Sequence, residues 1–185
     1  MIELASLETV EGSSAGHDVV LFALSTCPHC RHAREYLDKS GVSYRYVYVD
    51  QLEGDEQKTV LLASERYNPN HTVSHPRGRR RQRDHRVQGI GVPGEAQLSP
   101  AESITPEAEA LRDRLDGEAE AYGYHLNPEA SFTDELAQGL ATNVERYGYP
   151  LCPCRLTGGS RQADLDIICP CDYRDQDLAE YDTCY

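Results

Sequence analysis

Seven cysteines, arranged in two groups, constrain the fold of this chain more than any other feature of its sequence. The first group is the tetrapeptide Cys27-Pro28-His29-Cys30. The N-terminal residues lack a basic stretch followed by an apolar one, so no secretory signal is indicated and we expect a soluble, cytoplasmic chain. Structural disulfides are rare in that compartment, and clustered thiols there indicate redox chemistry or metal binding. The second group lies toward the C-terminus and comprises Cys152, Cys154, Cys169, Cys171 and Cys184.

The balance of charges excludes some classes of function. The 185 residues include 31 Asp and Glu against 18 Lys and Arg, which gives a formal net charge of −13. A general nucleic-acid binder needs a basic face to contact phosphates, so we expect no nucleic-acid partner. The chain also lacks an apolar run near the ~18 residues of a membrane-spanning helix, so we expect no membrane partner.

The residues around the first cysteine pair predict an alternation of strands and helices. The apolar run at 19–24 is typical of a strand buried on both faces. A helix is expected from Pro28 to about residue 39, because proline suits a first helical turn and Ser40-Gly41 suits a helix end. A second strand at 42–49 and a second helix at 53–66 follow. Strand, Cys-x-x-Cys helix, strand and helix form the start of a thioredoxin-like α/β sheet.

The position of the tetrapeptide favours thiol chemistry. A thiol at a helix N-terminus faces the positive end of the helix dipole, which stabilises its thiolate, so Cys27 is the expected nucleophile and Cys30 the expected resolving thiol. Half of a zinc site and a pair of inert buried thiols are the alternative interpretations. The sequence from Ser25 to Asp50 resembles glutaredoxin, and this resemblance covers roughly residues 17–73.

The glutaredoxin resemblance ends at a basic stretch. It implies a cis-proline, a β-hairpin and a closing helix after Val73, but residues 77–86 carry six arginines instead. A functional basic insertion, a disordered arm and a local reading-frame error are three interpretations that stay open, and the thioredoxin-like module is incomplete as the sequence stands. Residues 89–104 read as a linker. We therefore expect a redox module at 1–75, a basic stretch and linker at 76–104, and a second domain at 105–185.

Two helices are predicted at the start of the second domain. Thr105-Pro106 has the pattern of an N-cap followed by proline in the first turn of a helix that extends to about Tyr122. Another helix is expected to open at Thr133, with Phe132 just before it as a hydrophobic staple. The expected domain is mostly α-helical.

Two Cys-Pro-Cys tripeptides carry the chemistry of this second domain. With the sequences at 123–128 and 145–155, they resemble the catalytic subunit of ferredoxin–thioredoxin reductase over roughly residues 105–185. The resemblance implies a ferredoxin as electron donor, a thioredoxin or glutaredoxin-type disulfide protein as acceptor, and Cys154 as the redox nucleophile. It also implies a 4Fe–4S cluster bound by Cys152, Cys169, Cys171 and Cys184, in line with the usual four thiolate ligands.

Position 185 departs from the family pattern. The resemblance implies that the disulfide partner of Cys154 follows two residues after Cys184, with a histidine between them. This sequence has Tyr185 there and ends. We therefore expect the 185-residue form to bind a cluster but to fail as a ferredoxin-dependent reductase.

The expected activity is an iron–sulfur thiol–disulfide oxidoreductase. It would pass ferredoxin electrons through the cluster and Cys154 to a disulfide, with the Cys27–Cys30 pair of the same chain as first recipient. A non-catalytic iron–sulfur redox sensor or carrier, and a structural zinc protein, are the alternatives.

Overall fold

The structure is a computed structural model that describes residues 6–65, 104–181 and 184. We refer to residues 6–65 as the N-terminal segment and to residues 104–184, with their gap, as the C-terminal segment. These ranges exclude the basic stretch at 77–86, nearly all of the linker and Tyr185. The two expected domain boundaries, around 76 and 104, lie at or beyond the edges of these ranges. The expected domain limits therefore stay predictions.

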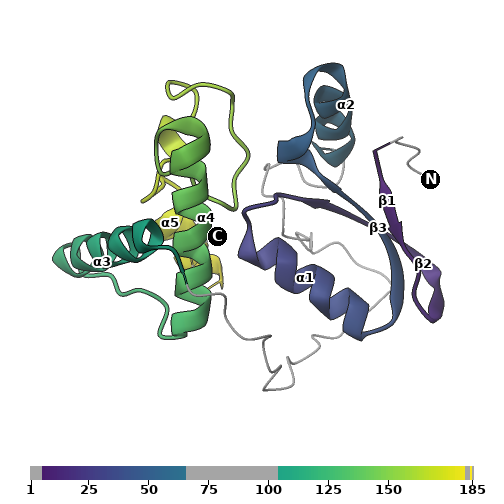
Figure 1. Ribbon diagram of the computed structural model, residues 1–185, viewed down its shortest axis with the longest axis horizontal. Helices are drawn as coiled ribbons and strands as arrows, with labels where there is room; N and C mark the ends of the chain where they lie inside the picture. Colours follow the sequence, from purple (N-terminus) through teal and green to yellow (C-terminus); the bar gives the residue numbers. More distant parts are fainter. Residues whose placement is uncertain (1–5, 66–103, 182–183, 185) are drawn as a thin grey trace.

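The N-terminal segment has the expected thioredoxin-like α/β arrangement (Figure 1). The two predicted strands, β2 (Ser14–Ala23) and β3 (Val42–Tyr48), pair in parallel. The sequence did not predict β1 (Glu8–Val10), which pairs antiparallel with β3. Within the described residues the strand order is β1-β3-β2. The elements are β1 (Glu8–Val10), β2 (Ser14–Ala23), α1 (Pro28–Lys39), β3 (Val42–Tyr48), a 3₁₀ turn η1 (Val49–Gln51) and α2 (Gly54–Glu65).

The expectation that the run at 19–24 is buried on both faces holds only at its end. Ala23 and Leu24 are buried, whereas residues 19–22 are half-buried. The reason is the strand order, because β2 lies at an edge of the described sheet. Ala23 and Leu24, which lead into the tetrapeptide, are therefore the best-packed part of this strand.

The C-terminal segment is mostly helical, as predicted. Helix α3 packs against α4, and α4 in turn contacts α1 of the N-terminal segment (Figure 1). The hydroxyl of Thr105 accepts a hydrogen bond from the backbone N–H of Ala108 at 3.3 Å, which confirms the predicted N-cap. The elements are α3 (Pro106–Ala121), α4 (Ala130–Tyr147), a 3₁₀ turn η2 (Leu165–Ile167) and α5 (Arg174–Tyr181).

Helix α4 begins three residues earlier than predicted. The backbone N–H of Thr133 already donates to the carbonyl of Glu129, and its hydroxyl donates to the carbonyl of Asn127. Thr133 therefore lies inside the helix, and the predicted staple by Phe132 is wrong. The Phe132 ring instead packs against His29 of α1, with ring centroids 4.9 Å apart.

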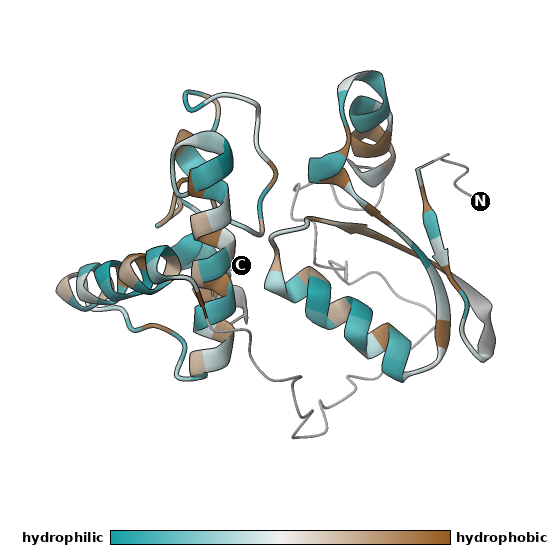
Figure 2. Ribbon diagram, in the orientation of Figure 1, coloured by the Kyte–Doolittle hydropathy of each residue, from teal (hydrophilic) through white to brown (hydrophobic). Residues whose placement is uncertain are grey.

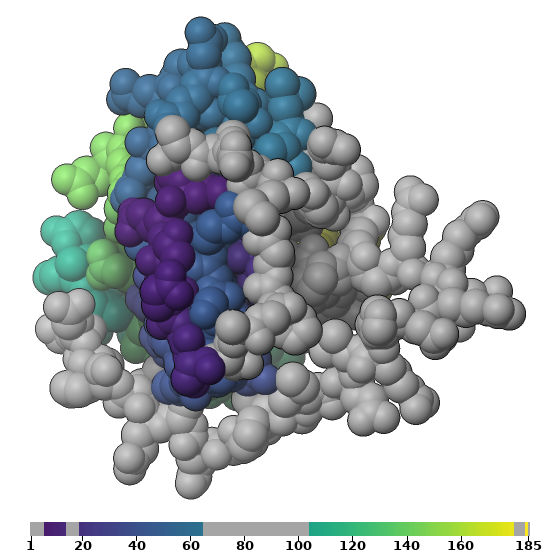
Figure 3. Space-filling view, turned by 90° about the vertical axis from the view of Figure 1, so that its right-hand side faces the viewer, coloured from purple at the N-terminus to yellow at the C-terminus, as the bar shows by residue number. Residues whose placement is uncertain are grey.

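One apolar core runs across both segments. In Figure 2 apolar and polar residues alternate along each helix. None of the described helices is long and apolar enough to cross a membrane. β1 and α2 lie at the surface on the side of the molecule shown in Figure 3. The core cluster that joins the segments consists of Ala23, Leu24, Cys27, Cys30, Val47, Val49, Val60, Cys152 and Cys154.

Candidate thiol exchange site

Cys27 is placed by the turn between β2 and α1. It is the N-cap residue of α1, its N–H donates to the carbonyl of Leu24, and its carbonyl accepts from the N–H of Arg31. Cys30 follows one helical turn later, and both thiols are buried, with 3% and 0% exposure. The structure thus places both thiols of the predicted redox pair at the buried N-terminal end of α1.

The two Cys-Pro-Cys tripeptides are held side by side by backbone hydrogen bonds. The N–H of Cys152 donates to the carbonyl of Ile167 at 2.9 Å, and the N–H of Cys169 donates to the carbonyl of Pro150 at 2.8 Å. The side chain of Asn143, from α4, adds a bond to the carbonyl of Leu151. Residues separated by 17 positions in sequence therefore share one site.

Buried charges fix the loops that carry these cysteines. The carboxylate of Asp164 is fully buried and accepts hydrogen bonds from the hydroxyls of Tyr149 and Thr157. The guanidinium of Arg155, next to Cys154, forms a buried ion pair with Asp177 of α5 at 2.7 Å. Such paired buried charges hold a loop in one geometry, because either charge alone would be strongly unfavourable in the interior.

The central observation is a contact between the two cysteine groups. The Sγ atoms of Cys27 and Cys154 lie 3.4 Å apart in the buried core, and Cys154 is 2% exposed. Cys154 also contacts Cys152. A continuous series of thiol contacts therefore links the two segments, in the order Cys30, Cys27, Cys154, Cys152, Cys171 and Cys184.

Two of these thiols favour the thiolate form. Hydrogen bonds from Cys154 and from Cys30 lower the pKa of Cys27 to about 3. The contact with Cys27, together with burial, raises the pKa of Cys30. Contacts with Cys152 and Cys27 raise the pKa of Cys154. In the other group, contacts with Cys152 and then Cys184 lower the pKa of Cys171 to about 2.

Three of the four predicted cluster ligands open onto one cavity. Its volume is about 470 Å³, which is within the 300–1,000 Å³ typical of cofactor and small-molecule sites. Cys152, Cys169 and Cys184 line it, together with apolar side chains of α3 and α4. Burial and the charge of Cys171 raise the pKa of Cys169 to about 11.

The fourth predicted ligand, Cys171, contacts both Cys152 and Cys184. Four cysteine sulfurs in and beside a cavity of this size fit an iron–sulfur cluster, which is bound by soft thiolate ligands. Across residues 6–65, 104–181 and 184, no group of three or more His, Cys, Asp or Glu side chains is arranged for a single metal ion.

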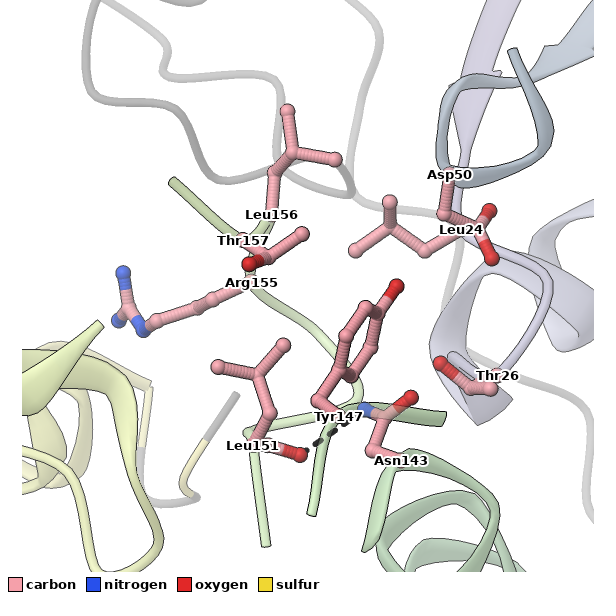
Figure 4. Close-up of a pocket in the computed structure, with 9 residues that line it drawn as sticks. All are labelled: Leu24, Thr26, Asp50, Asn143, Tyr147, Leu151, Arg155, Leu156 and Thr157. Atoms are coloured by element: carbon pink, nitrogen blue, oxygen red, sulfur yellow. Dashed lines mark hydrogen bonds between the residues drawn. The ribbon is translucent and has the colours of Figure 1, made fainter. Parts of the chain in front are cut away.

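The contact between Cys27 and Cys154 sits in a wider interface. Figure 4 shows Leu24, Thr26 and Asp50 facing residues of α4 and of the loop after it, around a small cavity of about 10 Å³. The guanidinium of Arg146 bridges to the carboxylate of Asp50 at 3.0 Å and to the hydroxyl of Ser25 at 3.1 Å. These polar contacts lie beside the buried thiols.

Sequence reasoning did not single out Gly139, which also lies in this interface. A Cβ atom at this position of α4 would lie 2.5 Å from the carbonyl oxygen of Thr26 and 2.9 Å from Cβ of Pro153. The available signal was an isolated glycine inside a helical pattern, which often marks a close approach.

The fold and site define a two-segment thiol-redox protein, and comparisons with known proteins agree. Residues 101–185 match the family described as ferredoxin thioredoxin reductase catalytic beta chain, and residues 19–68 match glutaredoxin. The chain thus joins a glutaredoxin-like segment to a segment like the catalytic chain of ferredoxin–thioredoxin reductase, which confirms both resemblances predicted from the sequence.

Two individual relatives are glutaredoxins. Glutaredoxin 1 of Rickettsia prowazekii (strain Madrid E) is 31% identical over 48 residues, which are 26% of this chain and half of that protein. A crystal structure of glutaredoxin from Methanosarcina mazei Go1 is 38% identical, with a TM-score of 0.33, and the match covers 38% of this chain and 66% of that one.

Proposed function

We propose that the protein is a disulfide reductase in which the C-terminal segment reduces the Cys27–Cys30 disulfide of the same chain, which then reduces client disulfides. The observation that carries this proposal is the 3.4 Å distance between the Sγ atoms of Cys27 and Cys154. Thiol–disulfide exchange requires direct contact between the attacking sulfur and the disulfide.

The exchange step follows from the order of the thiols. Cys154 loses its proton and attacks Sγ of Cys27 in the oxidised pair. The Cys27–Cys30 bond breaks, and Cys30 leaves as a thiolate that takes up the proton lost by Cys154. The product is a mixed disulfide between Cys27 and Cys154. Its reduction requires two electrons and two protons and returns both residues to thiols. The low pKa of Cys27 makes it a good leaving group in that second step.

The proposed source of the electrons is a 4Fe–4S cluster. Cys152, Cys169, Cys171 and Cys184 would hold it, which fits their thiol contacts and the cavity that three of them line. When bound, the cluster would accept electrons singly from a ferredoxin-type donor. Seven free thiols also suit a reducing compartment such as the cytoplasm.

The test is to follow the oxidation state of the Cys27–Cys30 pair in the anaerobically purified full chain. A chemically reduced ferredoxin serves as donor, and alkylation followed by mass spectrometry counts the free thiols. The family pattern at position 185 led us to expect no ferredoxin-dependent turnover. The contact between Cys27 and Cys154 leads us instead to expect that the parent chain gains two thiols at this pair and that the Cys154→Ser chain gains none. Dithiothreitol should reduce the pair equally in both chains, which controls for the N-terminal segment.

Three outcomes would contradict the proposal. Reduction of the pair at the parent rate in Cys154→Ser would show that electrons take another path. Iron and zinc analysis of the same samples separates the alternatives, since one zinc per chain would indicate a structural zinc protein, and a full cluster without thiol formation would indicate a sensor or carrier.

A further inference from the structure

Three residues on one face of α4 hold the N-terminal segment. We call Glu135, Gly139 and Arg146 the docking stripe. Their spacings of four and seven residues place them on one side of a helix, because 3.6 residues complete each turn. Helix α1 of the N-terminal segment packs against α4 (Figure 1).

The two ends of the docking stripe carry opposite charges, and each pairs with an opposite charge of the N-terminal segment. At one end, Glu135 forms an ion pair with Arg31 and lies 3.0 Å from Nε2 of His32. At the other end, Arg146 bridges to Asp50 and to the hydroxyl of Ser25. The reverse orientation would place like charges together, so the order of charges selects one orientation of docking.

Gly139 lies between these ends. Here α4 touches both the turn that leads to Cys27 and the loop that carries Cys152 and Cys154. Thr26, whose carbonyl oxygen a Cβ at this position would approach to 2.5 Å, directly precedes Cys27. Pro153, whose Cβ would lie at 2.9 Å, stands between Cys152 and Cys154. A glycine in a helix interior weakens the helix relative to alanine, so the close approach explains its presence.

From these contacts we propose that the docking stripe positions Cys27 against Cys154, and that Gly139 is its positioning residue. The occupant is the glutaredoxin-like segment of the same chain, residues 6–65, because Arg31, Ser25 and Asp50 supply the complementary groups. This inference rests on the proposed function. It adds that the exchange depends on a defined surface of α4 and not on the tether alone.

A trapping experiment measures this positioning directly. In a Cys30→Ser full chain with its metal bound, Cys27 cannot return to its own partner. Diamide then accepts two electrons and two protons from Cys27 and Cys154, and a disulfide forms between them. The rate is followed by peptide mapping of the linked cysteines, and iron content is measured in parallel.

Gly139→Ala is compared with Gly117→Ala, each in the Cys30→Ser chain. Gly117 lies in α3, and a Cβ there meets nothing within 4 Å. Gly139→Ala should slow the linkage by roughly 10- to 100-fold, because a misplacement of about 1 Å can cost that much. Gly117→Ala should link at the rate of the Cys30→Ser chain, and iron content should be equal in all three.

The outcomes separate this inference from the proposed function. Equal linkage rates in Gly139→Ala and Gly117→Ala would overturn the role of Gly139 while leaving the exchange itself intact. No linkage even in the Cys30→Ser chain would contradict the proposed exchange and the inference with it.

A second pair of variants tests the charges and does not depend on how Gly139→Ala folds. Glu135→Arg should slow the linkage by at least several-fold, and adding Arg31→Glu should restore most of the rate, since the charges are exchanged. Rescue of this kind is not expected from a merely structural role. An unchanged rate in Glu135→Arg, or no recovery in the double variant, would overturn the role of the charge order.

Discussion

Cys27 has two partners, and the chemistry at the residue scale follows from both. Cys30 lies one turn along the same helix, and Cys154 belongs to the other segment. Their hydrogen bonds lower the pKa of Cys27 to about 3 and raise those of the two donors. In the reduced chain the pattern gives an ionised Cys27 sulfur between two protonated ones, so Cys27 leaves readily as a thiolate when its mixed disulfide with Cys154 is reduced.

Replacing Cys27 by serine should abolish reduction of client disulfides and leave the iron content unchanged. A hydroxyl cannot form the mixed disulfide on which exchange depends. The measurement is ferredoxin-dependent reduction of a model disulfide, together with iron analysis. Client reduction at the parent rate would show that the N-terminal segment takes no part in the reaction.

Replacing Cys169 or Cys171 by serine should release most of the iron and bleach the chromophore. The serine hydroxyl is a hard ligand that binds iron more weakly than the soft cysteine thiolate. Loss of one of four ligands destabilises the cluster. Cys30→Ser is the matched control, since Cys30 lies outside the proposed ligand set and should keep the parent iron content. Iron retained in both ligand variants would assign it to other residues.

At the scale of elements, α4 and α5 support the loops that carry the cysteines. Asn143 of α4 bonds the carbonyl of Leu151, just before the first Cys-Pro-Cys. Asp177 of α5 pairs with Arg155, just after it, and the Arg155 guanidinium lies 4.1 Å from the centre of the Tyr173 ring. The tripeptide is thus fixed from both sides by side chains of neighbouring elements.

Asp177→Asn should lower the free energy of unfolding by about 3–5 kcal/mol, because it leaves the Arg155 charge buried without its partner. Glu118→Gln is the control, since it removes an exposed pair with Arg114 on α3 and should cost only about 0.5 kcal/mol. Urea unfolding of both variants gives the two values. Equal losses would show that the buried pair does not stabilise this loop.

Sequence patterns predicted most elements because local signals define them. The proline at the start of α1 and the threonine cap of α3 are such signals, and both were confirmed. The start of α4 was misplaced because Thr133 has the side chain of a cap but uses its hydroxyl inside the helix. Strand β1 was missed because a three-residue strand has too little periodicity to detect. Helix α5 also had no prediction.

At the scale of the whole molecule, the contact between Cys27 and Cys154 joins positions 127 residues apart. The sequence predicted that the two thiols act in one relay, from the two resemblances. It could not predict their contact, because Glu135, Gly139 and Arg146 form one surface only once helix α4 has folded. The ligand set stays a prediction. Whether the 185-residue form fails as a reductase, as the family pattern at position 185 implies, is decided by the ferredoxin-dependent reduction of the Cys27–Cys30 pair.

The arrangement in one chain predicts that exchange is intramolecular. Two variants that are each inactive, Cys27→Ser and Cys154→Ser, retain between them one complete set of exchanging thiols. When they are mixed at about 1 µM, client reduction should be on the order of 10³-fold slower than for the parent, because a tethered partner has an effective concentration near millimolar. The rate per chain in the mixture should rise in proportion to protein concentration, whereas the rate per chain of the parent should not.

The control for this mixture is the parent chain combined with an equal amount of the Cys27→Ser/Cys154→Ser double variant. Each parent chain carries both thiols, so the control should keep the full activity of its parent share. A mixture of single variants that approaches the control at about 1 µM would show exchange between chains. In that case the docked contact of Cys27 with Cys154 would serve a second copy of the protein as readily as its own segment, and the tether would confer no advantage.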